Sequence, residues 1–158
     1  MAERRIGVAM DFSPSSKKAL RWAADNLVRK GDTLVLLHIR HHGREEAKNV
    51  LWSHTGSPLI PLEELMEPPV RQRYDMPEDP EVFDMLNAVA RQKELCVVVK
   101  MYWGDPREKV CEAVGELNLE SLVMGSRGLG QIQRILLGSV TNYVLSHAAC
   151  PVTVVKSK

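Results

Sequence analysis

The sequence has almost no net charge and no long apolar run. Its 158 residues include 21 Lys and Arg and 20 Asp and Glu, which gives a formal net charge of +1. A chain this close to neutral has no global field that attracts nucleic acid or an anionic membrane, so any anion site must be local. No stretch approaches the roughly 18 apolar residues that a membrane span needs. We therefore expect neither nucleic acid nor a membrane as a partner.

Paired cysteines and targeting segments are also lacking. The three cysteines, Cys96, Cys111 and Cys150, are widely spaced and form no CxxC pair, which indicates reduced thiols in a cytosol-like compartment rather than a disulfide framework. We interpret them as small buried apolar side chains and not as redox switches. The charged residues 1–5 lead directly into a strand-like segment and show no signal-peptide pattern. We expect a cytoplasmic protein, or one that is present in the nucleus as well.

Five short apolar segments alternate with segments of helical periodicity. Apolar runs typical of buried strands cover residues 5–10, 33–39, 95–102, 119–124 and 151–155. Two of the helices between them begin with a capping residue and a proline, at Ser13-Pro14 and Asp105-Pro106. Such alternation favours parallel strands with right-handed crossovers. The sequence predicts one α/β domain over residues 1–158, a three-layer sandwich on a five-stranded parallel sheet of order 3-2-1-4-5.

The segment over residues 40–79 interrupts this pattern. It has no regular periodicity, and six prolines in or beside it leave only residues 62–67 for a short helix. A connection of this length is either a functional lid or a partly disordered insertion. Its histidines, His41, His42 and His54, match no metal-ligand spacing, so we expect no metal site there.

A glycine-rich segment follows the fourth apolar run. It reads Gly125-Ser126-Arg127-Gly128, nine further residues, and then Gly138-Ser139-Val140-Thr141 before a helical stretch. Glycine exposes backbone N–H groups, and the start of a helix favours negative charge, so this segment is suited to a phosphate. The structural alternative is that these glycines permit positive φ or close packing.

Residues at the ends of two other predicted strands fall at the same edge of the sheet. In a doubly wound sheet, ligands bind beyond the carboxyl ends of the strands, where the strand order reverses. Asp11 follows the first strand, Gly125 ends the fourth, and His38 and Ile39 end the second. This convergence favours a ligand that contains phosphate.

The residue types indicate a division of roles. Gly125 and Gly128 would let the backbone approach a sugar or its first phosphate. Residues 138–141 would offer N–H groups and two hydroxyls to the phosphates, and Arg127 would neutralise their charge. Asp11 suits a ribose hydroxyl, an adenine amino group or a phosphate-bound Mg²⁺.

Two of these residues have a structural alternative as helix caps. Asp11 could cap the helix that follows it, although Ser13 already fills that position. Ser139 could be the N-cap of its own helix, which is compatible with a bound anion at the same helix end.

Several known nucleotide motifs are absent. No Gly-Lys-Ser/Thr follows the glycines, which excludes a P-loop. Residues 125–130 invert the G-x-G-x-x-G order and follow the fourth strand rather than the first. The Ser-Gly-Gly loop and the His-Ile-Gly-His turn of adenylation enzymes are also missing.

Four motifs carry a family resemblance: Met10-Asp11-Phe12-Ser13, Leu36-Leu37-His38-Ile39, Gly125-x2-Gly128-x9-Gly138-Ser139, and Pro151 to Lys156. Together they resemble the universal stress protein family in its ATP-binding branch, over the whole chain apart from residues 40–79. Residues 102–107 and 124–128 resemble the plant members.

This resemblance implies a Rossmann-like domain that binds ATP, or AMP or ADP, with Mg²⁺ or Mn²⁺ on the phosphates. It implies adenine near Asp11 and residues 38–39, ribose at the first glycines and phosphates at residues 138–141. It identifies no residue of the protein as a metal ligand, and it places the metal with the phosphates, near Asp11. It also implies a homodimer through the last strand, Val152–Val155. The nucleotide-binding residues it implies are Met10, Asp11, His38, Ile39, Met124, Gly125, Arg127, Gly128, Gly138, Ser139, Val140 and Thr141.

An ATP site is not yet an ATPase. Hydrolysis needs a group that orients water and cations that stabilise the transferred phosphoryl, and Gln131 and Gln133 are weak candidates for the first role. We predict no catalytic residue and interpret the protein as a nucleotide-dependent sensor or switch in a stress response. The alternative is a dimeric stress scaffold or chaperone-like protein with incidental nucleotide, and a weaker one is slow ATP hydrolysis.

Overall fold

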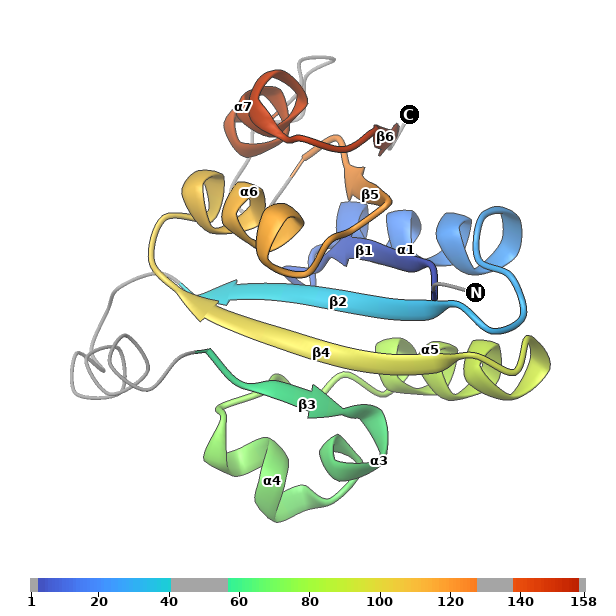
Figure 1. The fold of residues 1–158 in the computed structure, drawn as a ribbon. Coiled ribbons are helices and arrows are strands. Elements are labelled where there is room, and N and C mark those ends of the chain that lie inside the picture. The colour runs from blue at the N-terminus through green and yellow to red at the C-terminus, as the bar shows by residue number, and fades with distance from the viewer. Residues whose placement is uncertain (1–2, 41–56, 128–137, 157–158) are drawn as a thin grey trace.

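Six strands form one sheet, with helices on both of its faces (Figure 1). The computed structural model describes residues 3–40, 57–127 and 138–156. In chain order the elements are β1 (Arg5–Ala9), α1 (Pro14–Asn26), β2 (Thr33–Arg40), β3 (Leu59–Pro61), α3 (Leu62–Leu65), α4 (Pro68–Arg73), α5 (Pro80–Gln92), β4 (Cys96–Trp103), α6 (Pro106–Glu116), β5 (Ser121–Gly125), α7 (Ser139–His147) and β6 (Val152–Val155).

The sheet is mixed, which corrects the prediction of five parallel strands. Its order is β3-β4-β2-β1-β5-β6. The five predicted strands are parallel and lie in the predicted order across the sheet. Strand β3 adds a sixth strand at the edge, antiparallel to β4. The central strand β2 is buried from Thr33 to His38, which explains its unbroken apolar run.

The end of the predicted irregular segment is ordered. Residues 57–79 contain β3 and two short helices, α3 and α4. Beside the strand, the N–H of Met101 donates to Pro58 at 3.1 Å and the ammonium of Lys100 donates to Ser57 at 2.8 Å. Residues 41–56, which include the three histidines, lie outside the described ranges. The role of residues 40–79 as a lid stays a prediction.

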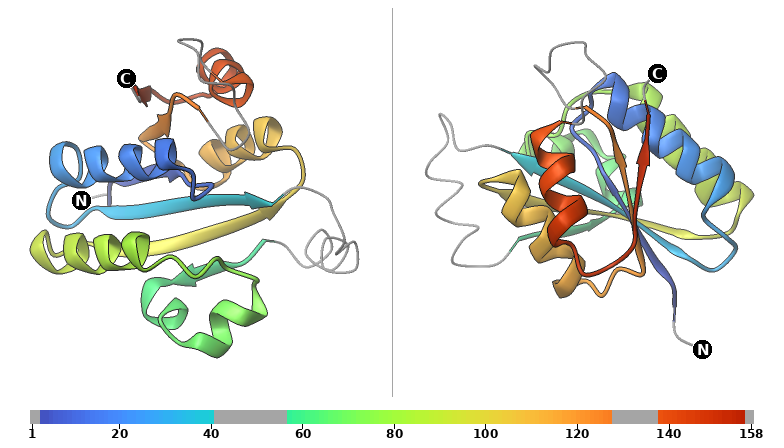
Figure 2. Two further views of the ribbon diagram at one scale, coloured as in Figure 1. Left: turned by 180° about the vertical axis from the view of Figure 1, so that it is seen from behind. Right: turned by 90° about the horizontal axis from the view of Figure 1, so that it is seen from above.

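Two apolar cores lie on opposite faces of the sheet. Helices α1 and α5 cover one face, and α6 and α7 cover the other (Figure 2). The first core contains Ile6 and Leu34 with Leu20 of α1, and the second contains Val35 and Leu122 with Val110 of α6. These three layers confirm the predicted α/β sandwich.

Side-chain caps fix the starts of three long helices near the carboxyl ends of the strands. Ser13 accepts from the N–H of Ser16 at 3.2 Å, and Asp105 from that of Arg107 at 3.0 Å, as their sequence predicts. Asp79 caps α5 in the same way, by accepting a hydrogen bond from the N–H of Val82 at 3.3 Å.

None of the helices within the described ranges is both long and apolar enough to span a bilayer.

Candidate functional site

The start of α7 is attached to the end of β5 by two hydrogen bonds. The N–H of Gly138 donates to the carbonyl oxygen of Ser126 at 2.7 Å. The hydroxyl of Thr141 donates to the carbonyl oxygen of Gly125 at 2.9 Å. Ser126 is held in turn, because its N–H donates to Val155 of β6 at 3.2 Å. The first turn of α7 is therefore fixed at the carboxyl edge of the sheet, where α/β folds bind ligands.

Gly138, and not Ser139, is the N-cap of α7. Its backbone is extended, with φ −63° and ψ 156°, and as a glycine it offers no side-chain acceptor to the first turn. The alternative prediction of Ser139 as the N-cap is therefore wrong. The first N–H groups of a helix have no partner within the helix, so a glycine cap leaves those of residues 139–141 for an external acceptor.

One of the two hydroxyls predicted for the phosphates is already used within the fold. Thr141 is 4% exposed, and its hydroxyl proton is used by Gly125, so its side chain anchors α7 and cannot donate to a phosphate at the same time. Val140 packs against the second core, which leaves it only its N–H. Of the two predicted hydroxyls, that of Ser139 is the exposed one.

Gly125 is required by the packing of α1 against β5. A Cβ on Gly125 would lie 2.7 Å from both the carbonyl carbon and the carbonyl oxygen of Ser15. The space that we predicted for a sugar is, on this side of Gly125, filled by the first turn of α1. The hydroxyl of Ser15 also accepts from the N–H of Arg127 at 3.1 Å. Ser15 is thus a site residue that sequence analysis missed, since its type and spacing carry no signal.

The backbone of Arg127 marks the end of the described part of the glycine segment. Arg127 is half-buried and directly follows Ser126, whose carbonyl bonds the start of α7. The other predicted sugar-contacting glycine, Gly128, lies outside the described ranges, as do Gln131 and Gln133.

Asp11 holds the turn between β1 and α1. One carboxylate oxygen accepts from the N–H of Ser13 at 2.9 Å, and the N–H of Asp11 lies 3.4 Å from the hydroxyl of Ser16. Asp11 therefore shapes the turn, while Ser13 caps the helix as predicted. The carboxylate is half-buried and lies at the end of β1, next to β5 in the sheet.

His38 is clamped to the last residue before this turn. Its Nδ1 lies 2.9 Å from the carbonyl oxygen of Met10, and because a carbonyl only accepts, Nδ1 must carry the proton. The ring is 7% exposed. Burial lowers the pKa of His38, and the positive charge of Arg40 lowers it further, against the raising effects of Met10 and Asp11. His38 is therefore a neutral hydrogen-bond donor at neutral pH.

Three other predicted nucleotide-binding residues have side chains that belong to, or pack against, the core. Met10 and Met124 are 2% and 4% exposed, so their side chains stabilise the strand ends. The sulfur of Met10 lies 3.3 Å from the N–H of Phe12. Ile39 packs against the second core, on the opposite face of the sheet from His38.

Phe12 has a left-handed backbone, which the sequence did not reveal. Its φ is +63°, a region that bulky side chains rarely adopt. Its ring meets that of His38 edge to face, with centroids 5.2 Å apart and an interplanar angle of 85°. Outliers of this kind persist only where the surroundings fix them, and they are common at functional sites.

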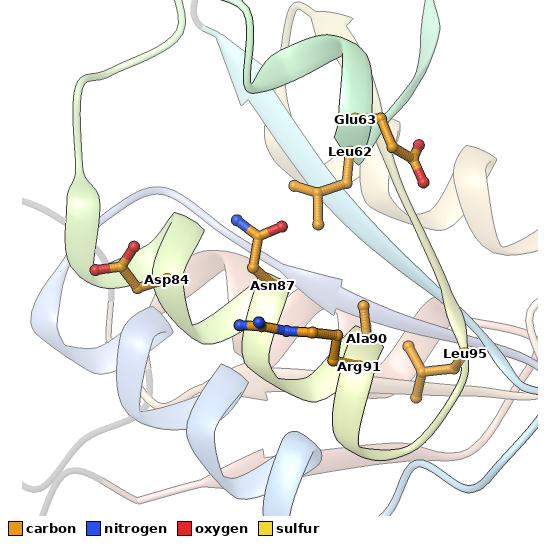
Figure 3. Close-up of a pocket in the computed structure, with 7 residues that line it drawn as sticks. All are labelled: Leu62, Glu63, Asp84, Asn87, Ala90, Arg91 and Leu95. Atoms are coloured by element: carbon orange, nitrogen blue, oxygen red, sulfur yellow. The ribbon is translucent and has the colours of Figure 1, made fainter.

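An open groove of about 670 Å³ lies elsewhere, between α3 and α5 (Figure 3). Leu62 and Leu95 at its base are already buried in the core, and Leu95 directly precedes β4. The groove thus extends toward the amino ends of the strands, away from the site, and offers little additional apolar surface. Its lining residues are Leu62, Glu63, Asp84, Asn87, Ala90, Arg91 and Leu95.

Metal and thiol chemistry find little support in the side chains. Across the described ranges, no three histidine, cysteine or acidic side chains gather closely enough to hold a metal ion. Burial raises the pKa of the Cys111 and Cys150 thiols, which disfavours reactive thiolates. Cys96 is exposed rather than buried, which corrects our interpretation for that residue.

Comparisons with known proteins agree with this fold. Residues 3–156 match the Universal stress protein family. Universal stress protein PHOS32 of Arabidopsis thaliana is 36% identical over 165 residues, which are 98% of this chain and 65% of the relative. This chain therefore spans somewhat less than two thirds of that protein.

Two solved structures share the fold. A universal stress protein family protein from Arabidopsis thaliana, solved with AMP bound, has a TM-score of 0.59 at 21% identity, over 98% of this chain and 92% of that chain. A universal stress protein in complex with cAMP has a TM-score of 0.60 at 18% identity, over 100% of both chains. Because the family match extends over residues 3–156, the chain belongs to the Universal stress protein family.

Proposed function

We propose that the protein binds an adenine nucleotide at the carboxyl edge of its sheet, with the phosphates at the start of α7. The observation that carries the proposal is the glycine cap of α7, fixed to β5 by the bonds of Gly138 and Thr141. It leaves helix N–H groups and the Ser139 hydroxyl for an anion. The AMP and cAMP in the two related structures support adenine as the base.

The base end of the nucleotide would lie toward the β1 turn. Asp11 offers carboxylate oxygens to donors, and the end of β2 offers backbone groups of residues 38–39. The ribose would lie between this turn and the glycine segment, near Gly125 and Gly128. Arg127 would neutralise part of the phosphate charge.

A divalent cation would be bound chiefly by the phosphates. Mg²⁺ keeps several waters and usually takes only one or two carboxylates from a protein. Asp11 is the nearest carboxylate of the turn, and one of its oxygens already accepts from Ser13. The donor set is consistent with Mg²⁺ or Mn²⁺ that arrives with ATP, which it would help to orient, and not with a resident metal.

The role that we propose is a switch and not an ATPase. Rapid hydrolysis needs a group that orients water beside the phosphates, and residues 138–141 contain no carboxylate, imidazole or glutamine. ATP occupancy would instead alter a dimer contact or a partner surface. Such a protein would respond to nucleotide during stress without consuming it quickly.

The substitution Gly138→Val tests the phosphate end of the site. Gly138 has φ −63°, which valine adopts without backbone strain, and at this buried position we expect the added side chain to crowd the anion. We expect ATP affinity in the presence of Mg²⁺ to fall about 100-fold or more, because the charge-assisted contacts are lost. Isothermal titration calorimetry measures the affinity, and chromatography of the denatured wild type identifies any nucleotide that it carries.

Gly115→Val is the matched control. Gly115 is an exposed glycine of α6, and an added Cβ there would meet nothing within 4 Å. This variant should bind ATP as the wild type does. A wild-type protein that neither carries nucleotide nor gives binding heat with ATP would contradict the proposed function and favour the scaffold. Turnover of ATP that persists in Gly138→Val would indicate a contaminating enzyme.

A further inference from the structure

The turn after β1 depends on a side chain from the neighbouring strand. Met10 directly follows β1, and its N–H donates to the carbonyl oxygen of Leu37 of β2 at 2.8 Å. Its oxygen accepts from Nδ1 of His38. Both polar groups of Met10 are therefore bound to β2, one by its backbone and one by a buried imidazole, and this residue directly precedes Asp11.

The same imidazole supports the unusual backbone of Phe12. The two rings meet edge to face, an arrangement that the aromatic quadrupole favours. Phe12 adopts a φ of +63°, which costs free energy unless contacts compensate it. His38 thus contacts the turn on both sides of Asp11, at Met10 before it and at Phe12 after it.

We propose that His38 is a positioning residue that holds Asp11 in the orientation that receives the base end of the nucleotide. This inference rests on the proposed function. His38 need not touch the ligand, because its Nδ1–H bond to Met10 and its ring contact with Phe12 fix the backbone on either side of the carboxylate. A displacement of about 1 Å at such a group is enough to weaken binding strongly.

A core histidine with no role beyond stability is the competing explanation. The two differ in the effect of a residue that retains the donor. An asparagine amide reaches nearly the position of Nδ1, so His38→Asn keeps a donor for the Met10 carbonyl, although it loses the ring. His38→Leu fills a similar volume without any donor and leaves the carbonyl unsatisfied.

The experiment compares ATP affinity with the geometry of the turn. Calorimetry with ATP and Mg²⁺ is carried out on the wild type, His38→Asn, His38→Leu and His147→Leu. His147 is the matched control, because its Nδ1 also bonds a backbone carbonyl, that of Tyr143, at 2.8 Å, but on the exposed face of α7. Amide chemical shifts of residues 11–13 are recorded for each variant without nucleotide.

We expect His38→Leu to bind ATP about tenfold more weakly or worse, His38→Asn within about threefold of the wild type, and His147→Leu as the wild type. The amides of residues 11–13 should shift in His38→Leu and stay near their wild-type positions in His38→Asn. Wild-type affinity in His38→Leu, or equal losses in the leucine and asparagine variants, would overturn the inference.

Failure of the proposed function gives a different result. If the wild type does not bind ATP, the proposed function is wrong and so is the ligand that we assign to Asp11. The amide shifts then still report whether His38 holds the turn. If His38→Leu melts far below the other proteins, the inference is tested with His38→Asn alone. A tenfold loss of affinity in that variant would then contradict a role of His38 through its hydrogen-bond donor.

Discussion

The contact between Gly125 and Ser15 leaves no room for even one methyl group. A Cβ on Gly125 would lie 2.7 Å from two backbone atoms of Ser15, which move only if α1 moves. We expect Gly125→Ala to lower the free energy of unfolding by about 3 kcal/mol, as overpacking at a rigid contact does. Urea denaturation followed by circular dichroism measures this change.

Gly115→Ala is the control for this substitution. It adds the same methyl group to an exposed helical position with open space around it. Alanine is the better helix former, so we expect the free energy of unfolding to rise by about 0.5–1 kcal/mol. Equal effects of the two substitutions would mean that α1 does not pack tightly on β5.

The sequence predicted which residues gather at the carboxyl edge of the sheet but not the contacts that each of them makes. Glycine spacing and the ends of the strands brought Asp11, Gly125 and residues 138–141 together. The sequence could not reveal that the Thr141 hydroxyl donates to Gly125, or that Ser15 occupies the side of Gly125 where a Cβ would lie. Such contacts depend on which face of α1 meets β5, and no local pattern specifies that.

At the level of elements, the features that depend only on neighbouring residues, such as helix caps, were predictable. The caps at Ser13 and Asp105 need only the next three residues. The short strand Leu59–Pro61 was not predictable, because three residues between prolines carry no periodicity and form a strand only against the edge of β4. The short helix expected within residues 62–67 is α3, whereas α4 was not predicted, because six residues that begin with two prolines carry no periodic signal.

Asp79 connects two helices that cover the same face of the sheet. It caps α5 and pairs with Lys17 of α1 at 2.6 Å. Burial raises the pKa of Asp79, but the hydrogen bonds from Lys17 and Val82 outweigh it, and the net shift is downward. A carboxylate whose folded pKa is lowered stabilises the fold above its unfolded pKa, and this stability is lost as the pH falls through the folded pKa.

We therefore expect Asp79→Ala to lower the free energy of unfolding by about 1 kcal/mol or more at pH 7, through loss of the cap. Asp79→Asn keeps an acceptor for the cap but loses the charge. Its difference from the wild type should be constant between about pH 7 and 5 and should shrink below about pH 4, near the unfolded pKa of an aspartate. Urea denaturation across this range measures both, with Asp84→Asn, an exposed carboxylate of the same helix, as the control. A difference that grows toward acid pH would contradict the assigned pair.

Across the whole molecule, the sheet ends in two very different edges. One edge is β3, which has three residues and ends at Pro61, features that block further strand pairing. The other is β6, with the sequence Val-Thr-Val-Val and every side chain half-buried. Its β-branched run has no such protection. We therefore propose, as the family resemblance implies, that two copies of the chain pair through β6.

Proline substitutions in β6 test that proposal, because alternate residues of a strand direct their N–H and C=O groups to opposite sides. The carbonyls of Pro151 and Val155 bond β5, so Thr153 faces β5 and Val154 faces the open edge. We expect Val154→Pro to convert a dimer to a monomer with little change in subunit stability, whereas Thr153→Pro should lower stability by about 3 kcal/mol. Sedimentation velocity measures the oligomeric state, and urea denaturation the stability. A wild-type protein that sediments as a monomer, or a Val154→Pro variant that stays dimeric, would show that β6 is not the interface.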